Sequence, residues 1–449
     1  MSSHNVHPIT DEALGNTSYL VAVGDGEAIS IDPRRDVADH LDLAARMGLR
    51  IVATLETHLH ADFVSGSREI ASATAAEIVA AKDANLGFAH RPVAAQDRLE
   101  FAGASIEVLA TPGHTPEHLA YHLRNGHERA VFSGGSLIVG GAARTDLTGA
   151  DRTDQLARAQ FESMLSLATL PDDTTLYPTH GGGSFCSTTK ARSTTSTIGE
   201  ERATNPLLAA RDEDEFVAIL RAGFGTYPTY FSHLREVNHE GAALVAALPE
   251  VGNLSADDAW KAITGGARLI DARPIETWAR AHAPEAVSIE LRPAFASWLG
   301  WVVPFGAPIV LMLEAHQLEE AVRLARRIGY DAITGWISFD AWHEAGFPVS
   351  AIDEVDAERA EQMTKNRVVF LDVRQAAEFA SGHIAGATHV ELGDIIGGKT
   401  PGAESVITYC GHGERSATAA SLLAQRGLKV ANLHGGTAGW RTAGYDFEP

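Results

Sequence analysis

The sequence predicts a three-domain α/β protein, and three observations lead to this prediction. The chain has 449 residues, which is too long for one hydrophobic core and is enough for three domains of ordinary size. Short apolar runs typical of buried strands alternate with segments of helical periodicity. Two stretches separated by the length of one small domain resemble each other, so part of the chain is an internal repeat. We expect domains at residues 1–250, 251–352 and 353–449.

Charge and cysteine content limit the partners and the compartment. The formal net charge of −22 disfavours nucleic acid and anionic membranes as partners, because both require a basic surface. Cys186 and Cys410 are the only cysteines, so there is no disulfide framework and a reducing compartment is favoured. The first residues lack the basic and apolar regions of a secretion signal. We therefore expect a cytoplasmic protein that acts on small molecules.

One apolar stretch, residues 294–313, has the length of a membrane span. Two glycines and two prolines interrupt it, and these residues break helices. We predict a loop that leads into a buried strand, with no membrane helix.

Apolar runs of the first domain end in residues that bind metals. His58 and His60 lie two residues apart in an extended segment, and Asp62 continues the alternation. His114 and His180 each follow a further apolar run. Because imidazole and carboxylate groups are ligands of transition metals, these strand ends form a candidate metal site.

A loop rich in Gly, Ser and Thr follows His180 and extends to residue 198. It contains Cys186, which we interpret as an ordinary loop cysteine. A role for Cys186 in relaying sulfur near the metal pocket remains open.

The internal repeat aligns four pairs of residues between its two copies. Each copy has the order strand, helix, strand, helix, which predicts a small doubly wound sheet. The aligned pairs are Asp271 with Asp372, Arg273 with Arg374, Trp278 with Phe379, and His282 with His383.

In the second copy, a predicted strand ends at Cys410 and a loop of small residues leads directly into a helix. Backbone N–H groups at such a helix start, together with the helix dipole, stabilise a thiolate or a persulfide anion. Arg415 adds a fixed cation that could hold an anionic sulfur donor such as thiosulfate. The residues between them form the predicted anion-binding loop: Gly411, His412, Gly413 and Glu414.

The stretches VFLDVRQAAEFASGHIAGATHVEL and CGHGERS resemble the rhodanese family. The resemblance implies a sulfurtransferase in which Cys410 becomes a persulfide and Arg415 binds anions. It also implies that Asp372, Arg374 and His383 organise the core. In the first copy Leu313 occupies the nucleophile position, so we expect that domain to be inactive and structural.

The stretches TLETHLHADFVSGSREI, ATPGHTPEHLAYHL, FSGGSLIVG and LYPTHGGGSFC resemble the metallo-β-lactamase superfamily, and more narrowly the persulfide dioxygenases fused to rhodanese domains. The resemblance implies an αββα sandwich with one Fe(II) per chain, held by two histidines and a carboxylate. It transfers His58 and His114 as ligands and places His60, Asp62 and His180 in the surrounding site. The implied reaction oxidises a low-molecular-weight persulfide, such as glutathione persulfide, to sulfite.

Two residues depart from the superfamily pattern. Phe63 follows Asp62 where the superfamily has a histidine, and Gly135 replaces the carboxylate ligand. Three cofactor states therefore remain open: Fe(II), zinc held by His58, His60 and His114 with Asp62 as a further ligand, or no metal.

The sequence leaves three functions open. The first is a bifunctional enzyme, with persulfide oxidation in the first domain and sulfur transfer at Cys410. The second is a non-catalytic first domain that serves as a binding platform beside an active sulfurtransferase. The third is a thiolester hydrolase of the glyoxalase type. A homodimer is the assembly that we consider for each of them.

Overall fold

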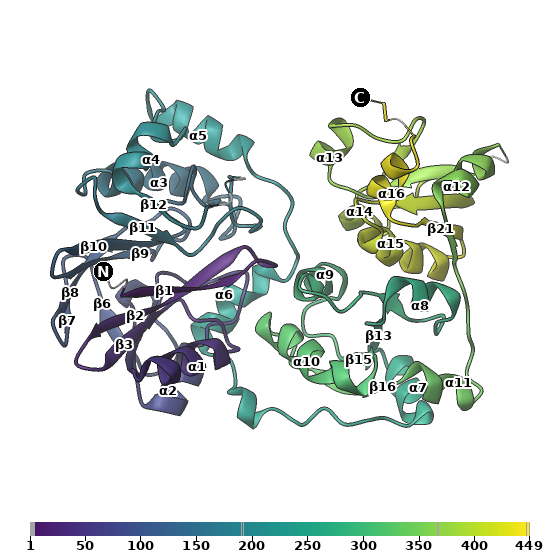
Figure 1. Cartoon of the computed structure of the whole chain (residues 1–449), viewed down its shortest axis with the longest axis horizontal. Helices are drawn as coiled ribbons and strands as arrows, with labels where there is room; N and C mark the ends of the chain where they lie inside the picture. Colours follow the sequence, from purple (N-terminus) through teal and green to yellow (C-terminus); the bar gives the residue numbers. More distant parts are fainter. Residues whose placement is uncertain (1–4, 190, 192, 366–367, 446, 449) are drawn as a thin grey trace. The chain divides into compact units, whose positions relative to one another are not determined.

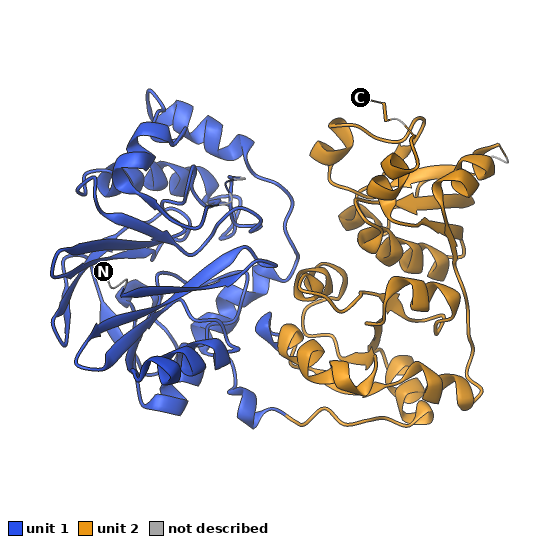
Figure 2. Cartoon of the chain, viewed as in Figure 1, with its two compact units in different colours: residues 1–248, 326–329 blue, residues 249–325, 330–449 orange. Residues whose placement is uncertain are grey.

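The computed structural model describes residues 5–189, 191, 193–365, 368–445 and 447–448. The chain divides into two compact units, which are coloured separately in Figure 2. Unit 1 comprises residues 1–248 with 326–329, and unit 2 comprises residues 249–325 with 330–449.

Unit 1 contains two six-stranded sheets. The first sheet follows chain order and consists of β1 (Val6–Asp11), β2 (Asn16–Gly24), β3 (Glu27–Ile31), β4 (Arg50–Leu55), β5 (Glu77–Ala81) and β6 (Arg91–Val93). The second has the order β12-β11-β10-β9-β8-β7 and consists of β7 (Arg98–Phe101), β8 (Ala104–Ala110), β9 (Leu119–Asn125), β10 (Glu128–Gly134), β11 (Thr175–Pro178) and β12 (Ser196–Thr197).

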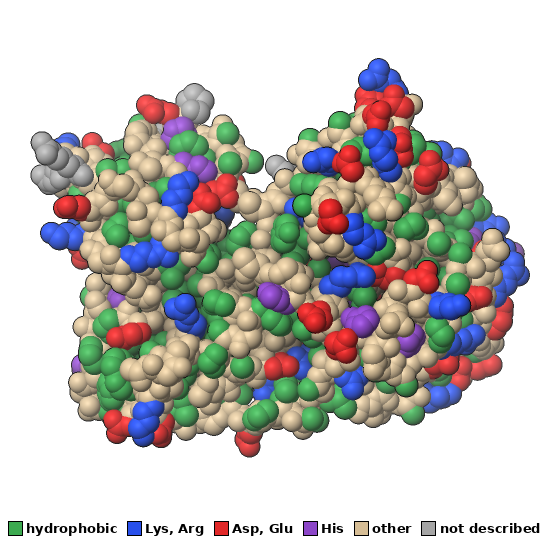
Figure 3. Space-filling model, turned by 180° about the vertical axis from the view of Figure 1, so that it is seen from behind, with side chains coloured by type: hydrophobic (Ala, Val, Ile, Leu, Met, Phe, Trp, Pro, Cys, Tyr) green, Lys and Arg blue, Asp and Glu red, His purple; other side chains and the backbone are tan. Residues whose placement is uncertain are grey.

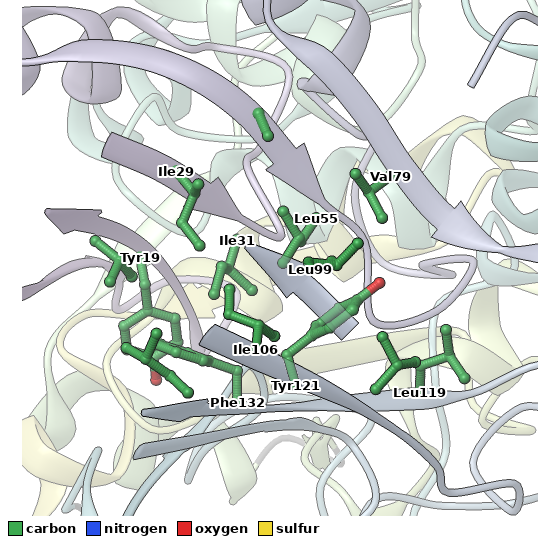
Figure 4. Packing of buried hydrophobic residues seen from close by; sticks show 14 of the residues in the cluster. Tyr19, Ile29, Ile31, Leu55, Val79, Leu99, Ile106, Leu119, Tyr121 and Phe132 are labelled. Carbon is green, nitrogen blue, oxygen red and sulfur yellow. The ribbon is translucent and has the colours of Figure 1, made fainter. Parts of the chain in front are cut away.

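The main core of unit 1 lies between these sheets. Alternating side chains of both sheets meet there, as Figure 4 shows for Ile31, Leu55, Leu99 and Ile106, and these four are fully buried. Helices α1 (Ala38–Met47) and α2 (Ser67–Thr74) cover the first sheet. The second sheet is covered by α3 (Thr153–Leu167), α4 (Ile198–Thr204) and α5 (Glu213–Ala222). The predicted αββα sandwich is therefore confirmed (Figure 1).

His40 on α1 is buried against the first sheet and offers a pH test of this packing. Its two ring nitrogens lie 2.9 Å from the Ser18 hydroxyl and 2.9 Å from the Ser30 hydroxyl. Burial, followed by the charge of Arg34, lowers the pKa of His40 from 6.5 to about 3. The unfolded chain therefore takes up a proton below pH 6.5 that the folded chain does not accept until about pH 3.

Neutral His40 thus makes its full contribution to the free energy of unfolding above pH 6.5, and this contribution is lost as the pH falls toward 3. We expect His40→Gln to destabilise unit 1 at neutral pH. The difference from the wild type should narrow on acidification, by up to about 1.4 kcal/mol per pH unit. The free energy of unfolding of both proteins, measured with urea between pH 6.5 and pH 3, gives this difference. A difference that does not depend on pH would contradict the neutral, buried state.

Unit 2 contains two sheets in which every paired strand is parallel. The first has the order β14-β13-β15-β16 and consists of β13 (Arg268–Asp271), β14 (Val287–Ser288), β15 (Ile309–Met312) and β16 (Ile333–Ile337). The second has the order β17-β21-β20-β18-β19 and consists of β17 (Asp353–Val355), β18 (Val369–Asp372), β19 (Thr388–His389), β20 (Ser405–Tyr409) and β21 (Lys429–Leu433).

Short helices connect the strands of unit 2. Those of the first copy are α7 (Ala256–Thr264), α8 (Ile275–Arg280), α9 (Phe295–Val302), α10 (Leu318–Arg327) and α11 (Phe339–Glu344). Those of the second copy are α12 (Ala357–Thr364), α13 (Ala376–Ala380), α14 (Leu392–Ile396), α15 (Glu414–Gln425) and α16 (Gly436–Thr442). The helix α6 (Phe231–Glu240) belongs to unit 1.

The internal repeat extends to individual hydrogen bonds. In the first copy the Arg273 guanidinium donates to Asp271 at 2.5 Å and to the carbonyl of Ala281 at 3.0 Å. In the second copy Arg374 donates to Asp372 at 2.6 Å and to the carbonyl of Gly382 at 2.8 Å. Each of these buried pairs lies at the end of a strand and ties it to the loop that follows.

Residues 294–313 differ from the sequence prediction. The predicted loop is in fact the helix α9, which is followed by the strand β15. The prolines fall after the helix, and Gly300 is accommodated because this face of α9 is buried with Phe295 and Leu299. Among the described residues, none of the helices combines the length and the apolar character needed to cross a membrane.

The acidic side chains do not form one large patch on the face of the molecule shown in Figure 3. Lys and Arg side chains are interspersed with Asp and Glu across that face. Although the chain has a net charge of −22, the acidic groups on this face have basic groups beside them.

Candidate functional sites

A cluster of buried histidines lies at one end of the sheets of unit 1. Each member follows or precedes a strand of the sandwich, so the scaffold fixes its position. All are at most 4% exposed, and they are His58, His60, His114, His118 and His180. Four of them were predicted from the sequence as candidate site residues. His118 was not, although it lies in the same TPGHTPEH motif as His114.

Three of these histidines direct one nitrogen each toward a common point. The Nδ1 atom of each of these three rings donates a hydrogen bond. The acceptors are Thr57 Oγ1 for His58 at 2.8 Å, the carbonyl of Arg144 for His114 at 2.6 Å, and Asn16 Oδ1 for His180 at 3.1 Å. The Thr57 hydroxyl and the Asn16 amide nitrogen themselves donate to Asp32 and Asp62, so Thr57 Oγ1 and Asn16 Oδ1 act as acceptors toward the imidazoles. The proton of each ring is thereby placed on Nδ1, and Nε2 carries the lone pair.

The lone pairs face each other across a short distance. His58 Nε2 and His180 Nε2 are 3.3 Å apart, and one nitrogen of each of His58, His114 and His180 lies within 4.8 Å of the others. Burial, before the charges of neighbouring groups, lowers the pKa of His114 and of His180 to about 3 and that of His58 well below its ordinary value. Neutral imidazoles with converging lone pairs repel one another unless a cation lies between them, so this donor set fits a metal ion.

His60 has a different environment. Its Nε2 lies 3.3 Å from Asp32 and 3.2 Å from Glu56. Burial alone would lower the pKa of His60, but the carboxylates of Asp32 and Glu56 outweigh burial and raise it to about 10. His60 is therefore an imidazolium paired with acidic groups, while its buried Nδ1 has no hydrogen-bond partner among the described residues.

The two departures from the superfamily pattern have structural counterparts. The Phe63 ring stacks on His60, with centroids 4.2 Å apart. A Cβ atom on Gly135 would lie 2.5 Å from Cδ2 of His114 and 2.9 Å from Cβ of Ala143. In this arrangement the His114 ring fills the space that a side chain at position 135 would need. The nitrogen of Gly135 donates to Nε2 of His118 at 3.0 Å, which explains why His118 is held outside the converging set.

Asp62 and Cys186 lie beside the cluster. Asp62 accepts a hydrogen bond from Asn16 at 2.9 Å, and its carboxylate is 3.5 Å from His180 Nδ1. Burial, together with the charge of Asp62, raises the pKa of Cys186 well above its ordinary value. Cys186 is therefore a protonated thiol, which is a poor nucleophile for relaying sulfur.

Cys410 occupies a loop between β20 and α15 of unit 2. Its Sγ accepts a hydrogen bond from the backbone N–H of Gly413 at 3.2 Å, and the Ser416 hydroxyl lies 3.7 Å away. Gly413 has φ of +115°, a conformation that glycine adopts readily. The carbonyl of Cys410 accepts from the N–H of Thr437 at 2.7 Å, which fixes the loop from behind. The sulfur thus accepts backbone and hydroxyl hydrogen bonds at the start of a helix.

The remaining members of the predicted loop lie around this sulfur. His412 is exposed, and Glu414 begins α15. A Cβ atom on Gly411 would lie 3.6 Å from Nη2 of Arg415, so the guanidinium is beside the loop.

Arg415 is not a free cation, because it is paired with Glu378 on α13. Its guanidinium donates to the two carboxylate oxygens at 2.6 and 2.8 Å. Burial would lower the pKa of Arg415, but the hydrogen bonds to Glu378 and the charge of Cys410 raise it. The sequence analysis did not identify Glu378, although this residue lies within the quoted VFLDVRQAAEFASGH stretch.

Family models match a part of each unit. Residues 12–180 match the model of the metallo-beta-lactamase superfamily, and residues 356–443 match the rhodanese-like domain. The human protein named persulfide dioxygenase ETHE1, mitochondrial, is 33% identical over 196 residues, which cover 43% of this chain and 71% of that protein. A hydroxyacylglutathione hydrolase of Methylobacillus flagellatus is 34% identical over 157 residues, which cover 34% of this chain and 58% of the hydrolase.

A solved structure extends the similarity beyond unit 1. The crystal structure of a metallo-beta-lactamase from Staphylococcus aureus subsp. aureus COL superposes with a TM-score of 0.66 and 29% sequence identity. The superposition covers 74% of this chain and 98% of that one. Because unit 1 alone is shorter than this coverage, the shared fold includes part of unit 2.

Proposed function

We propose, because the chain belongs to the metallo-β-lactamase superfamily and carries a rhodanese-like domain, that it is a sulfurtransferase of sulfane-sulfur metabolism that acts through Cys410. One observation carries this proposal: the Sγ of Cys410 accepts the Gly413 N–H at 3.2 Å in the loop that opens α15. Reactive cysteines lie in such hydrogen-bonded positions at helix starts, whereas structural buried cysteines lack these donors.

The loop residues support two transfer steps. In the first, the Cys410 thiolate attacks the outer sulfur of a donor, a new S–S bond forms, and the bond within the donor breaks as its remainder leaves with the electron pair. In the second, an acceptor thiolate or cyanide attacks the outer sulfur of the Cys410 persulfide and restores the thiolate. The Gly413 N–H and the Ser416 hydroxyl stabilise the sulfur anion before and after each step.

Thiocyanate formation tests this proposal. The full chain is incubated with thiosulfate or glutathione persulfide as donor and with cyanide as acceptor. We expect saturable thiocyanate production that is lost when Cys410 is alkylated. Production that is insensitive to alkylation would show that the transfer uses another group.

We propose further that unit 1 binds one divalent metal ion through Nε2 of His58, His114 and His180. The proposal is supported by the three protonated Nδ1 atoms, which leave three lone pairs directed at one another. Asp62, whose carboxylate lies 3.5 Å from Nδ1 of His180, is a candidate to supply a carboxylate, since the space at Gly135 is closed. When bound, iron would supply oxygen chemistry and zinc would supply Lewis acidity.

Metal analysis and two assays separate the functions that unit 1 could perform. Stoichiometric iron with oxygen uptake on glutathione persulfide would assign a persulfide dioxygenase. Stoichiometric zinc with cleavage of a glutathione thiolester would assign a hydrolase. A purified and metal-incubated chain that holds no metal would assign a binding platform and would refute the metal proposal.

A further inference from the structure

Two arginines lie beside the loop that carries Cys410, and each is paired with a carboxylate. Arg415 forms a two-point hydrogen bond with Glu378. Arg292, which belongs to the first copy of the repeat, lies 3.5 Å from Glu414 at the start of α15. The charges of these four side chains sum to zero, so this group offers no net attraction to a highly charged anion.

Arg415 is fixed in this paired state from two sides. Its guanidinium carbon lies 5.9 Å from the centre of the Trp298 ring, which is on α9 of the first copy. Its side chain is 18% exposed, and that of Glu378 is 38% exposed. Burial would raise the pKa of Glu378, but the hydrogen bonds and charge of Arg415 outweigh burial and lower it, so the carboxylate is ionised at neutral pH. A donor that approaches Cys410 therefore meets a guanidinium whose charge is already balanced.

Sulfur donors differ in the charge that they bring to the Cys410 loop. With thiosulfate, a dianion joins the Cys410 thiolate, and three negative charges gather around the reacting sulfurs. With an alkyl persulfide in its RSSH form, the thiolate carries the only negative charge at the reacting sulfurs. The Arg415–Glu378 ion pair has no net charge, so it stabilises the three charges of the thiosulfate reaction less than a free guanidinium would. It leaves the reaction of the uncharged RSSH group almost unaffected.

We infer that the Cys410 site takes alkyl persulfides in preference to thiosulfate, and that Glu378 is the residue that sets this preference. The inference rests on the sulfurtransferase proposal above and adds the class of donor. In the step concerned, the Cys410 thiolate bonds to the terminal sulfur of RSSH, the S–S bond of the donor breaks, and the thiolate RS⁻ leaves with the electron pair. The proton remains on the terminal sulfur, so atoms and charge balance without an oxidant or a reductant.

The repeat provides an internal comparison. Thr277 occupies the position of Glu378 in the first copy, as the aligned pairs on either side of it show. That copy has Leu313 in place of the nucleophile. The carboxylate is thus present in the copy that has the reactive sulfur and is replaced in the copy without it.

Glu378→Gln tests the inference, since it removes the charge and keeps the shape. The full chain is assayed without oxygen and with a metal chelator, so that the histidine cluster does not consume the donor. Thiosulfate and glutathione persulfide are compared with cyanide as acceptor, and the rate of Cys410→Ser is subtracted as background. We expect kcat/KM for thiosulfate to rise about tenfold, mainly through a lower KM, and kcat/KM for the persulfide to stay within about twofold.

Three further variants make the result specific. Glu378→Asp keeps the charge and should keep the wild-type preference, whereas Glu378→Thr introduces the residue of the first copy and should shift the preference as Gln does. Glu361→Gln removes an exposed charge from α12 of the same domain and should change neither donor. An unchanged ratio of the two kcat/KM values in both Glu378→Gln and Glu378→Thr would overturn the inference. The absence of any Cys410-dependent transfer in the wild type would instead refute the proposed function.

Discussion

Cys410→Ser is expected to lower sulfur transfer to cyanide by at least about 1,000-fold, because a serine hydroxyl neither ionises near neutral pH nor forms a persulfide. The change replaces one buried atom and leaves the hydrogen bond from Gly413 with an oxygen acceptor. The loop should therefore keep its fold, and the loss should appear in kcat. Thiocyanate production from either donor, measured under saturating conditions, provides the test.

Cys186→Ser is the matched control, since it changes the other cysteine of the chain. Cys186 is fully buried in unit 1 and has a raised pKa, so its thiol does not enter the transfer. We expect the transfer rate to stay within about twofold of the wild type. A large loss in Cys186→Ser with a retained rate in Cys410→Ser would reverse the assignment of the nucleophile.

His114→Ala is expected to weaken metal binding by unit 1 by at least about 100-fold, because it removes one of the three converging nitrogen donors. The carbonyl of Arg144 also loses its donor in this variant. Titration of the metal-free protein with zinc or cobalt reports the affinity without any reference to enzymatic activity. His58→Ala should have an effect of the same size, since the two histidines have equivalent roles.

His127→Ala is the control for this measurement. His127 is exposed in the turn between β9 and β10 and lies outside the buried cluster, so its loss should leave the affinity unchanged. Equal metal affinity in His114→Ala and His127→Ala would contradict the proposed ligand set. The stability of each variant should be checked by thermal unfolding, because His114 is buried.

Local sequence signals predicted the strands and loops that carry the reactive groups. Cys410 could be proposed as the nucleophile because the strand, the loop and the helix that surround it are contiguous in sequence. His58 and His114 could be proposed as metal ligands because each follows an apolar strand within a short motif. The parallel sheets of unit 2 followed from apolar runs that alternate with helical segments.

The pairings between distant segments could not be predicted in this way. Glu378 and Arg415 are 37 residues apart and meet only because α13 and the Cys410 loop lie at the same edge of the sheet. The charge of His60 depends on Asp32, which ends up beside it through the pairing of β3 with β4. The glycine at position 135 was visible in the sequence, but the filling of the adjacent space by the His114 ring was not.

The most direct test of the central claim is the mass of the protein after a brief exposure to glutathione persulfide, followed by removal of the donor. If the N–H groups at the start of α15 stabilise a sulfur anion on Cys410, the intact chain gains one sulfur atom, and peptide analysis places it on Cys410. The added mass should disappear when cyanide is supplied. An unmodified Cys410, or a sulfur adduct carried by Cys186, would contradict the account.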